Sequence, residues 1–585
     1  MKEFLQTLSN EQLDAIKSTN SILLTAIPGS GKTRSLINKI IFEYNESDST
    51  YIFAITYTKR AAYEIEDRIQ ENLGYLPLNI WIGTIHKFCL EFIVRGYGSF
   101  SELFSKNFQV ISEPDQEKIK SSLRKKYLIN DPFLNIDYTL NINGEPNEKM
   151  YYSLVMEYYD RLFEINKIDF NYILYETYNM LANYPHIRSQ LSTITKLICI
   201  DEYQDTQELQ YRILGLICNE NPKIGVFITG DVNQAIYEGI GGVTKTKDEL
   251  NAIFNRKFEQ RSLSGCYRSN QEIIDFYNKF SVEKMRMISK TDKWQNPHIS
   301  IICDKPKSQV YEDIFSIIEE SLRIGYKEND IAIVAPQWYQ LYDITTEIKK
   351  KFPTIKLDAP DIVPLKKDDD GIIFKISKLL LTTFDYYNLY RIKQLANEVK
   401  IQFYDEYGIQ LNTSIIDFLN LVKQSQTTDS KGTDFLKNSL LAFFTSIKLK
   451  EQFETDIMLF VEGTKERVEK FKEQGLEDEK IYFEQSLRSK TGIVISTCHG
   501  VKGEEYAIVI AFAMLEGYIP HWNDIINHKQ FARNRSRKLL FVVFSRAKEK
   551  LFIFAENDRK TKKKNFMFIN EDLKRVKTLY DNIIN

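Results

Sequence analysis

The chain has 585 residues, and at about 150 residues per domain this length predicts roughly four domains rather than one small module. It carries 78 lysine and arginine residues against 80 aspartate and glutamate residues, so its formal net charge of -2 excludes a protein coated with positive charge. Any contact with nucleic acid must therefore be local. Hydrophobic residues make up 43% of the chain and charged residues 27%, a balance that is typical of folded domains and argues against general disorder.

The sequence carries no signal for secretion or membrane insertion. The first ten residues include an acid and no long apolar run, and no stretch of about 18 apolar residues occurs, so we expect a cytoplasmic protein without contact to a membrane. The cysteines form no C-x-x-C pair, which argues against zinc ribbons, iron-sulfur clusters and disulfide frameworks. We interpret them as core thiols: Cys89, Cys199, Cys218, Cys266, Cys303 and Cys498.

Short apolar runs that end in Gly, Thr or Asp alternate with longer segments of helical periodicity, which is typical of parallel α/β units. The first set of expected strands comprises 21–26, 51–56, 80–84, 197–200 and 225–229. The second set comprises 299–303, 331–335, 493–497, 507–512 and 551–555. Long stretches rich in Tyr, Phe, Lys and Glu interrupt both sets. We therefore expect an α/β fold of two cores with parallel sheets, each carrying a mostly helical insertion.

A phosphate-binding loop is predicted where the first expected strand ends. The segment Ala26-Ile-Pro-Gly-Ser-Gly-Lys-Thr33 separates this strand from a segment with one buried helical face. Its expected nucleotide-binding residues are Gly29, Ser30, Gly31, Lys32 and Thr33. The glycines let backbone N–H groups turn toward phosphates, Lys32 would reach the β and γ oxygens, and Thr33 would ligate Mg²⁺. Ala26 departs from the strict pattern, which begins with glycine.

A second nucleotide element follows the expected strand at 197–200. This strand delivers the adjacent carboxylates Asp201 and Glu202 to its carboxyl end, where ligands bind in open α/β sheets. Asp201 can hold a metal ion, and Glu202 can polarise a water for attack on the γ-phosphate. Together with the phosphate-binding loop, this pair predicts that the protein uses ATP and Mg²⁺.

Eight motifs in chain order resemble those of the superfamily 1A DNA helicases, the UvrD/Rep-like family. They are Leu8–Gln12, Thr56–Ala62, Gly83–His86, Asp201–Thr206 with Gln210, Gly230–Tyr237, Tyr267–Arg268, Thr497–Glu505 and Ser545–Ala547. The resemblance covers nearly the whole chain. It implies two RecA-like P-loop cores, the first comprising 1–84 and 185–260 with a helical insertion at 85–184. The second comprises 261–360 and 490–585, with a helical insertion at 361–489.

The resemblance also implies how nucleotide is bound and hydrolysed. Three residues would recognise the nucleoside, namely Gln12 on adenine, Tyr267 stacked on adenine and Glu505 on the ribose. Gln234 would sense the γ-phosphate. Lys32 and Glu202 would take part in catalysis from the first core. Arg268 and Arg546 would reach across from the second core as arginine fingers. Hydrolysis would then require closure of both cores, which would couple chemistry to movement along a DNA strand.

The resemblance implies contacts with DNA at Thr56, Tyr57, His86, Tyr237 and His499. A motor that tolerates every sequence is expected to combine backbone contacts with stacking of bases on aromatic rings. The implied function is an ATP-dependent single-stranded DNA translocase and 3′–5′ helicase that acts on single-stranded and tailed duplex DNA. One alternative is an ATP-gated DNA-sensing regulatory subunit of a nuclease or defence complex with little unwinding of its own. An unrelated P-loop kinase does not account for the motifs of the second core.

Two departures from the family pattern affect these expectations. The segment Gly239-Ile-Gly-Gly242 replaces an expected aromatic ring and an expected cation, which would weaken the grip on DNA, and Arg535 and Ser536 stand where acidic residues are usual. The 39 residues that follow Arg546 are too few for an appended nuclease domain. We therefore expect a separately encoded partner, a nuclease or a repair or phage-defence factor.

Overall fold

The computed structural model describes residues 7–45, 48–106, 108–129, 134, 136–237, 241–359, 364–365, 371–382, 389–472, 476–485, 492–527, 529–561 and 563–584. The chain forms two compact units. Unit 1 comprises Met1–Lys106, Lys126–Asp304 and Val501–Asn585, and unit 2 comprises Asn107–Lys125 and Lys305–Gly500. The boundaries of these units differ from the domain boundaries predicted from the sequence. The division into domains stays a prediction.

Unit 1 contains a six-stranded parallel sheet in the order β3-β2-β6-β7-β1-β8. Its strands are β1 (Ile22–Ala26), β2 (Tyr51–Thr56), β3 (Ile80–Thr84), β6 (Thr195–Ile200), β7 (Gly225–Gly230) and β8 (Glu259–Leu263). Five of them were predicted. The sequence did not reveal β8, because this edge strand reads Glu-Gln-Arg-Ser-Leu and is largely exposed, so it lacks the apolar run of a buried strand.

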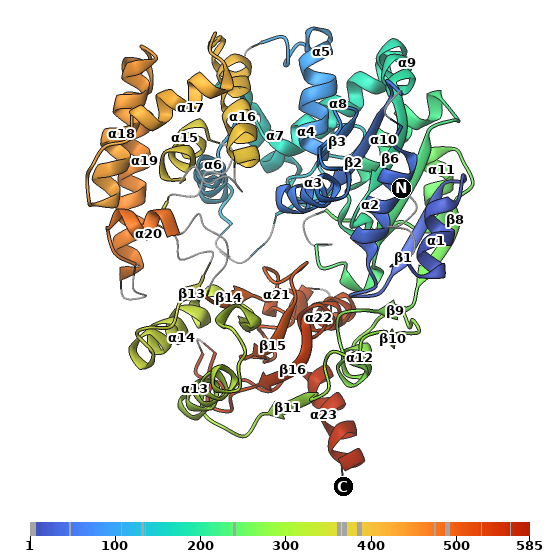
Figure 1. Cartoon of the computed structure of the whole chain (residues 1–585), viewed down its shortest axis with the longest axis vertical. Coiled ribbons are helices and arrows are strands. Elements are labelled where there is room, and N and C mark those ends of the chain that lie inside the picture. The colour runs from blue at the N-terminus through green and yellow to red at the C-terminus, as the bar shows by residue number, and fades with distance from the viewer. Residues whose placement is uncertain are drawn as a thin grey trace. The chain divides into compact units, whose positions relative to one another are not determined.

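Helices surround this sheet in the N-terminal part of unit 1, some in contact with its strands and others packed on neighbouring helices. They are α1 (Asn10–Lys17), α2 (Lys32–Glu43), α3 (Lys59–Leu73), α9 (Pro185–Ile194), α10 (Glu208–Glu220) and α11 (Lys247–Phe254). Helix α3 lies against β2 and β3, and α2 lies against β6 and β7 (Figure 1). In α2 the fully buried Leu36 and Ile40 are four residues apart and therefore face the same side.

The segment between β3 and β6 is mostly helical. In unit 1 its elements are α4 (Ile85–Phe88), the π-helix η2 (Cys89–Val94), α5 (Arg95–Tyr97), η3 (Gly98–Phe100), η4 (Lys149–Tyr151), α7 (Tyr152–Glu164), β5 (Lys167–Ile168) and α8 (Phe170–Asn183). Helix α8 packs against α10, which joins this segment to the first sheet. Tyr158 and Tyr159 of α7 are buried and fill the centre of this segment.

Further strands of unit 1 come from later in the chain. Strands β11, β16 and β15 pair in parallel in that order, and the short strands β9 and β10 pair with each other. The elements are β9 (Gly265–Cys266), α12 (Gln271–Asn278), β10 (Ile288–Ser289), β11 (His298–Ile302), β15 (Tyr506–Ala511), α21 (Trp522–Asn527), α22 (Lys529–Phe544), β16 (Ala547–Phe554) and α23 (Glu571–Ile584). Helix α22 packs against α12 and β16.

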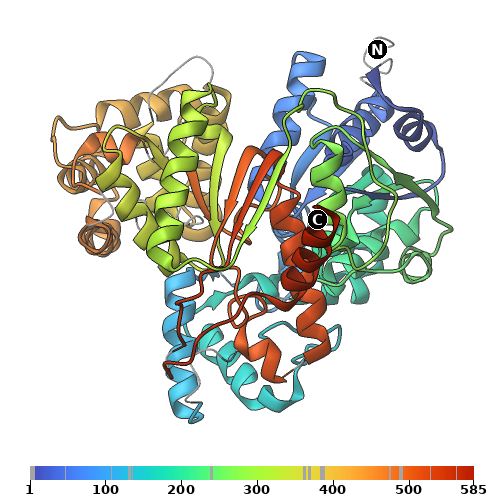
Figure 2. The same ribbon diagram turned by 90° about the horizontal axis from the view of Figure 1, so that it is seen from below.

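Unit 2 combines parallel strands with a group of helices. Its strands β12, β14 and β13 pair in parallel. Its elements are β4 (Gln109–Val110), α6 (Glu113–Lys126), α13 (Lys307–Arg323), η8 (Glu328–Asp330), β12 (Ile331–Ala335), α14 (Trp338–Lys351), β13 (Leu357–Asp358), α15 (Ile372–Leu381), α16 (Leu389–Tyr407), α17 (Ile415–Gln424), α18 (Gly432–Ser446), α19 (Lys450–Lys470), α20 (Lys480–Gln485) and β14 (Ile493–Thr497). The yellow and orange helices gather into one bundle (Figure 2), whose core includes the mutually packed rings of Phe403, Phe444 and Phe453.

The prediction of an α/β fold built on parallel sheets with mostly helical inserted segments is confirmed. Five of the six cysteines are buried, as expected of core thiols, whereas Cys303 is half-buried. Within the part of the chain that the structure describes, no helix is both long enough and apolar enough to cross a membrane.

Candidate functional site: a nucleotide cleft in unit 1

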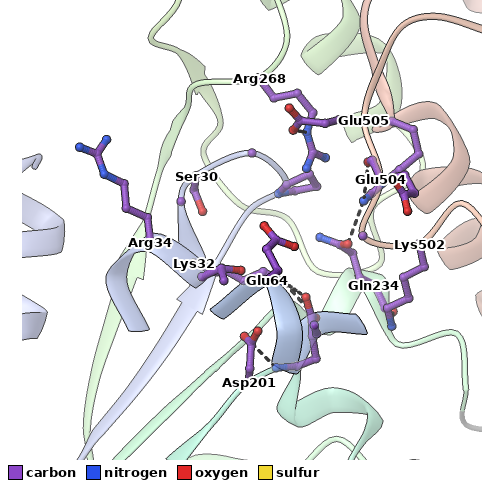
Figure 3. A pocket seen from close by; sticks show the side chains of 18 of the residues that line it. Ser30, Lys32, Arg34, Glu64, Asp201, Gln234, Arg268, Lys502, Glu504 and Glu505 are labelled. Atoms are coloured by element: carbon purple, nitrogen blue, oxygen red, sulfur yellow. Dashed lines mark hydrogen bonds and ion pairs between the residues drawn. The ribbon is translucent and has the colours of Figure 1, made fainter. Parts of the chain in front are cut away.

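A cavity of about 740 Å³ opens at the carboxyl ends of the strands of the first sheet, and all its lining residues belong to unit 1. This volume lies within the range of small-ligand sites. In Figure 3 Lys32 and Asp201 lie on one side of the space and Lys502, Glu504 and Glu505 lie on the other. Segments from both ends of the sequence therefore form one cleft.

The phosphate-binding loop connects β1 to α2 and makes two close backbone approaches. Gly29 has a φ of 72°, and a Cβ atom there would lie 2.5 Å from the Cβ atom of Arg268. Gly31 has a φ of 83°, and a Cβ atom there would lie 2.7 Å from Nε2 of Gln12. Only glycine meets both demands at either position. The loop ends at the N-terminus of α2, whose N–H groups and dipole favour an anion.

Gln12 is hydrogen-bonded to the backbone of this loop. Its Oε1 accepts a hydrogen bond from the backbone N–H of Ser9 at 3.0 Å, and its Nε2 donates to the carbonyl of Ser30 at 3.1 Å. The residue is 1% exposed and does not line the cavity. The structure thus places Gln12 as a brace of the phosphate-binding loop, and its contact with adenine stays a prediction.

Asp201 lies at the end of β6, where the sequence predicts it. Its Oδ1 accepts hydrogen bonds from the Thr229 hydroxyl at 2.7 Å and from the backbone N–H of Glu202 at 3.1 Å. Burial and the charge of Glu202 raise the pKa of Asp201 to about 6. A bound divalent cation would stabilise the ionised form of this carboxylate, as expected of a metal ligand.

Glu202 has an unusual backbone and a fixed side chain. Its φ of 53° is left-handed, a strained conformation that persists where the surrounding structure enforces it. Nζ of Lys32 lies 2.9 and 3.0 Å from the two carboxylate oxygens, and the side chain of Gln204 also donates to Glu202. Burial opposes ionisation, but the charges of Lys32 and Lys502 lower the pKa of Glu202 to about 2.

Gln204 connects this carboxylate to the next strand. It belongs to the 3₁₀ helix η5 (Tyr203–Asp205), is fully buried, and its Oε1 accepts from the backbone N–H of Asp231 at 3.0 Å. Its two functional groups therefore fix the Glu202 carboxylate relative to the end of β7. Gln204 lies within the motif Asp201–Thr206, but no role was predicted for it from the sequence.

Arg546 reaches the cleft from the start of β16. Its Nη2 donates to Oε1 of Gln234 at 2.8 Å, and Gln234 in turn donates to Oδ2 of Asp231 at 2.7 Å. The Arg546 side chain also donates to the carbonyl of Val542 at 2.9 Å, and the residue is 1% exposed. Burial and the neighbouring charge of Arg268 lower its pKa to about 9. The two residues predicted as γ-phosphate sensor and arginine finger are thus in direct contact.

Arg268 and Tyr267 lie beside the phosphate-binding loop. The backbone N–H of Tyr267 donates to the carbonyl of Gly29 at 2.8 Å, and the residue is 45% exposed and lines the cavity. Nε of Arg268 lies 2.8 Å from Glu505, whose other carboxylate oxygen lies 2.9 Å from Nζ of Lys548. These cations lower the pKa of Glu505 to about 2, against the effect of its burial.

The five residues predicted to contact DNA do not form one cluster within unit 1. The rings of Tyr57 and Tyr237 stack with centroids 5.1 Å apart, and both line the cavity. Thr56 is buried and donates to the carbonyl of Thr58, and the His86 ring packs against Phe170 at 4.9 Å. His499 belongs to unit 2 and is exposed. Gly239, in the segment that departs from the family pattern, lies outside the described residues.

Several residues of the cleft were not assigned a role from the sequence. Lys502 and Lys548 line the cavity together with Trp294, which has no motif of its own. Lys502 lies within the motif Thr497–Glu505, so its position in the sequence could have indicated that it belongs to the site. Near the last motif, Arg535 pairs with Asp524 of α21 at 2.9 Å, which supplies an acid that the adjacent sequence lacks.

Comparisons with known proteins identify the family of this chain. Residues 8–251 match the family described as UvrD/REP helicase N-terminal domain, and residues 378–558 match the UvrD-like helicase C-terminal domain. The chain is 24% identical over 624 residues to the ATP-dependent DNA helicase PcrA of Staphylococcus aureus, covering 94% of this chain and 84% of that protein. It is 24% identical over 628 residues to PcrA of Staphylococcus epidermidis, with the same shares covered.

The matched segments include the phosphate-binding loop, the Asp201–Glu202 pair and Arg546, which the structure gathers around one cavity. The cavity is thus lined by residues of both matched segments. The chain belongs to the UvrD/Rep-like family of superfamily 1A DNA helicases and is an ATP-hydrolysing enzyme.

Proposed function

We propose that this protein is an ATP-dependent single-stranded DNA translocase and 3′–5′ DNA helicase. The observation that supports this most is the contact between Arg546 and Gln234 within the cavity that also holds Lys32. It brings a cation from the C-terminal part of the chain to the phosphate-binding part. Hydrolysis would thus depend on the relative placement of two chain segments, which is the requirement for converting hydrolysis into movement.

The residues of the cleft fit MgATP. Thr33 and Asp201 both line the cavity and would hold Mg²⁺, which would supply positive charge to the phosphates. One carboxylate and one hydroxyl are an appropriate donor set, because Mg²⁺ usually keeps several waters and phosphate oxygens as its other ligands. Lys32 would turn from Glu202 to the β and γ phosphates, and Tyr267 offers an exposed ring on which adenine can stack.

The roles in hydrolysis follow from charge and position. Glu202 would act as a carboxylate that orients and polarises the attacking water, because the charge of Lys502 and the hydrogen bond from Gln204 also lower its pKa and do not depend on Lys32. Gln204 would keep the Glu202 carboxylate in place when Lys32 leaves it. Arg546 and Arg268 would stabilise the charge on the transferring phosphoryl group, and Gln234 would report the presence of the γ-phosphate through its contact with Arg546.

The strand contacts would centre on Tyr57 and Tyr237. Both residues line the cavity, and their rings stack on each other with centroids 5.1 Å apart, so a base could stack on this pair. Bases of any identity can stack on such rings, and this is how proteins bind single strands without reading their sequence. Thr56, His86 and His499 remain predicted contacts to the same strand.

The first test is ATP hydrolysis with and without single-stranded DNA. We expect oligothymidylate to stimulate turnover, because a strand held by both parts of the motor favours the closed cleft in which Arg546 meets Gln234. Steady-state phosphate release measures this directly, with double-stranded DNA of equal length as the comparison. Turnover that is the same with and without the single strand would contradict the proposed DNA-driven motor.

The direction of movement is tested with tailed duplexes. We expect a duplex with a 3′ single-stranded tail to be unwound faster than the same duplex with a 5′ tail, as the family resemblance implies. Strand displacement followed by fluorescence gives the two rates under identical conditions. Faster unwinding from the 5′ tail would contradict the polarity. DNA-stimulated hydrolysis without displacement from either tail would instead favour the alternative, an ATP-gated DNA-sensing subunit of a nuclease, repair or defence complex.

A further inference from the structure

Lys502 touches three parts of the cleft with one ammonium group. Its Nζ lies 2.5 Å from Oδ2 of Asp205 and donates to the backbone carbonyl of Gln234 at 2.7 Å. The same Nζ lies 4.8 Å from the ring centroid of Tyr237. Lys502 precedes β15, whereas Asp205 ends η5 and Gln234 ends the 3₁₀ helix η6 (Val232–Gln234). One side chain from the C-terminal part of the chain thus contacts segments that follow two strands of the first sheet.

The pair between Lys502 and Asp205 is buried. The two side chains are 10% and 1% exposed, and burial raises the pKa of Asp205 to about 6 although Lys502 acts to lower it. Among the described residues, Oδ1 of Asp205 is buried without a hydrogen-bond partner, so Lys502 supplies the main compensation for this carboxylate. Withdrawing the ammonium would leave a buried carboxylate without a cation, which is strongly unfavourable. The cleft is therefore biased toward the arrangement in which Lys502 is engaged.

The contact with Tyr237 connects this pair to the aromatic rings beside the cleft. The ring of Tyr237 contacts the ammonium group of Lys502 and stacks on the ring of Tyr57. A shift of Lys502 therefore changes the surroundings of both tyrosines. Lys502 also donates a hydrogen bond to the backbone carbonyl of Gln234. The side chain of the same Gln234 accepts a hydrogen bond from Arg546. Lys502 is thus in contact with the proposed γ-phosphate sensor and with the proposed DNA-stacking ring.

We propose that Lys502 is a positioning residue that couples nucleotide binding to the grip on DNA. In one state of the cleft, the one that the structure describes, Lys502 contacts Asp205 and Gln234. In the other state it leaves both residues, and the Tyr237 ring moves together with its ammonium group. This inference rests on the proposed function. Two ligands that each favour one state of such an element change each other's affinity, and this effect is reciprocal.

The experiment measures the dissociation constant of fluorescent oligothymidylate, about 16 nucleotides long to fill one site, with and without AMP-PNP. In the unmodified protein we expect the two constants to differ by about fivefold or more, which is the lower range of such couplings. In Lys502→Met, which keeps the length of the side chain but removes its charge, we expect the ratio to fall within about twofold of one, the usual margin for independent sites. Lys502→Arg keeps the charge and should restore part of the ratio.

Glu504→Gln is the matched control. Glu504 pairs with Arg60 of α3, so this substitution also removes an ion pair between the C-terminal segment and the N-terminal part of unit 1, whereas the cation over the Tyr237 ring comes from Lys502 and is retained. We expect Glu504→Gln to keep a clear effect of AMP-PNP on DNA affinity. Equal loss of the effect in both variants would overturn the inference, because it would assign the coupling to ion pairs in general.

The outcomes separate this inference from the proposed function. If the unmodified protein shows the effect and Lys502→Met keeps it, the inference is wrong and the proposed function stands. If the unmodified protein does not bind the oligonucleotide, or binds it equally with and without AMP-PNP, the result contradicts the proposed function itself. Should Lys502→Met not fold by thermal melting, Asp205→Asn tests the same pair from the other side and should also reduce the ratio.

Discussion

A Lys32→Ala variant is expected to hydrolyse ATP about a thousandfold more slowly than the unmodified protein, because it lacks the cation that would neutralise charge on the β and γ phosphates. The structure adds a second consequence. Lys32 is largely buried, and its pKa is raised because the charges of Glu202, Asp231 and Asp201 outweigh the effect of burial. Removing it leaves three close carboxylates without their shared cation, so we also expect a stability loss of about 1–3 kcal/mol.

The measurement is phosphate release at saturating ATP and single-stranded DNA, with thermal melting to verify the fold. Lys39→Ala provides a matched control on the same helix. Lys39 is also a buried lysine, but it donates to the carbonyls of Ile16 and Ser18 and to Glu43 and does not line the cavity. It should lower the melting temperature and leave the turnover of the folded protein near normal. A folded Lys32→Ala protein with near-normal turnover would show that this loop is not the phosphate site.

An Arg546→Ala variant is expected to slow the chemical step by roughly a thousandfold, as other losses of arginine fingers do, with a modest change in nucleotide affinity. In the structure the guanidinium is buried and donates to the side chain of Gln234 and to the carbonyls of Val542 and Glu504. Truncation therefore also leaves buried acceptors without donors, which destabilises the fold. Arg546→Lys retains a charge at this position and should lose less stability, although it lacks the planar fork that holds several acceptors at once.

Single-turnover hydrolysis separates the chemical step from ATP binding and product release. Arg533→Ala is a suitable comparison, because Arg533 pairs with Glu516 and Glu571 outside the cavity. It should change stability slightly and leave the single-turnover rate intact. An Arg546→Ala protein that is folded and hydrolyses bound ATP at the normal rate would rule out the arginine-finger role.

The sequence by itself determined the elements whose signals are local. The strand, the loop Ala26–Thr33 and the helix of the phosphate-binding segment are contiguous, so apolar patterning and glycine spacing were sufficient to predict them. The Asp201–Glu202 pair followed from the same logic, because a buried strand delivers its next residues to the ligand-binding edge of a parallel sheet. The edge strand β8 escaped this reasoning because its side chains are polar and exposed.

Only the tertiary structure decided which distant residues meet. Lys502 and Asp205 are 297 positions apart, and Arg546 and Gln234 are 312 apart, so no local pattern indicates either contact. The contact between the Gln12 amide and the Ser30 carbonyl, 18 positions apart, is likewise set by packing, and the contact of Gln12 with adenine stays a prediction. Side-chain partners depend on how two sheets bring their strand ends together, and that convergence is a property of the folded chain rather than of any segment.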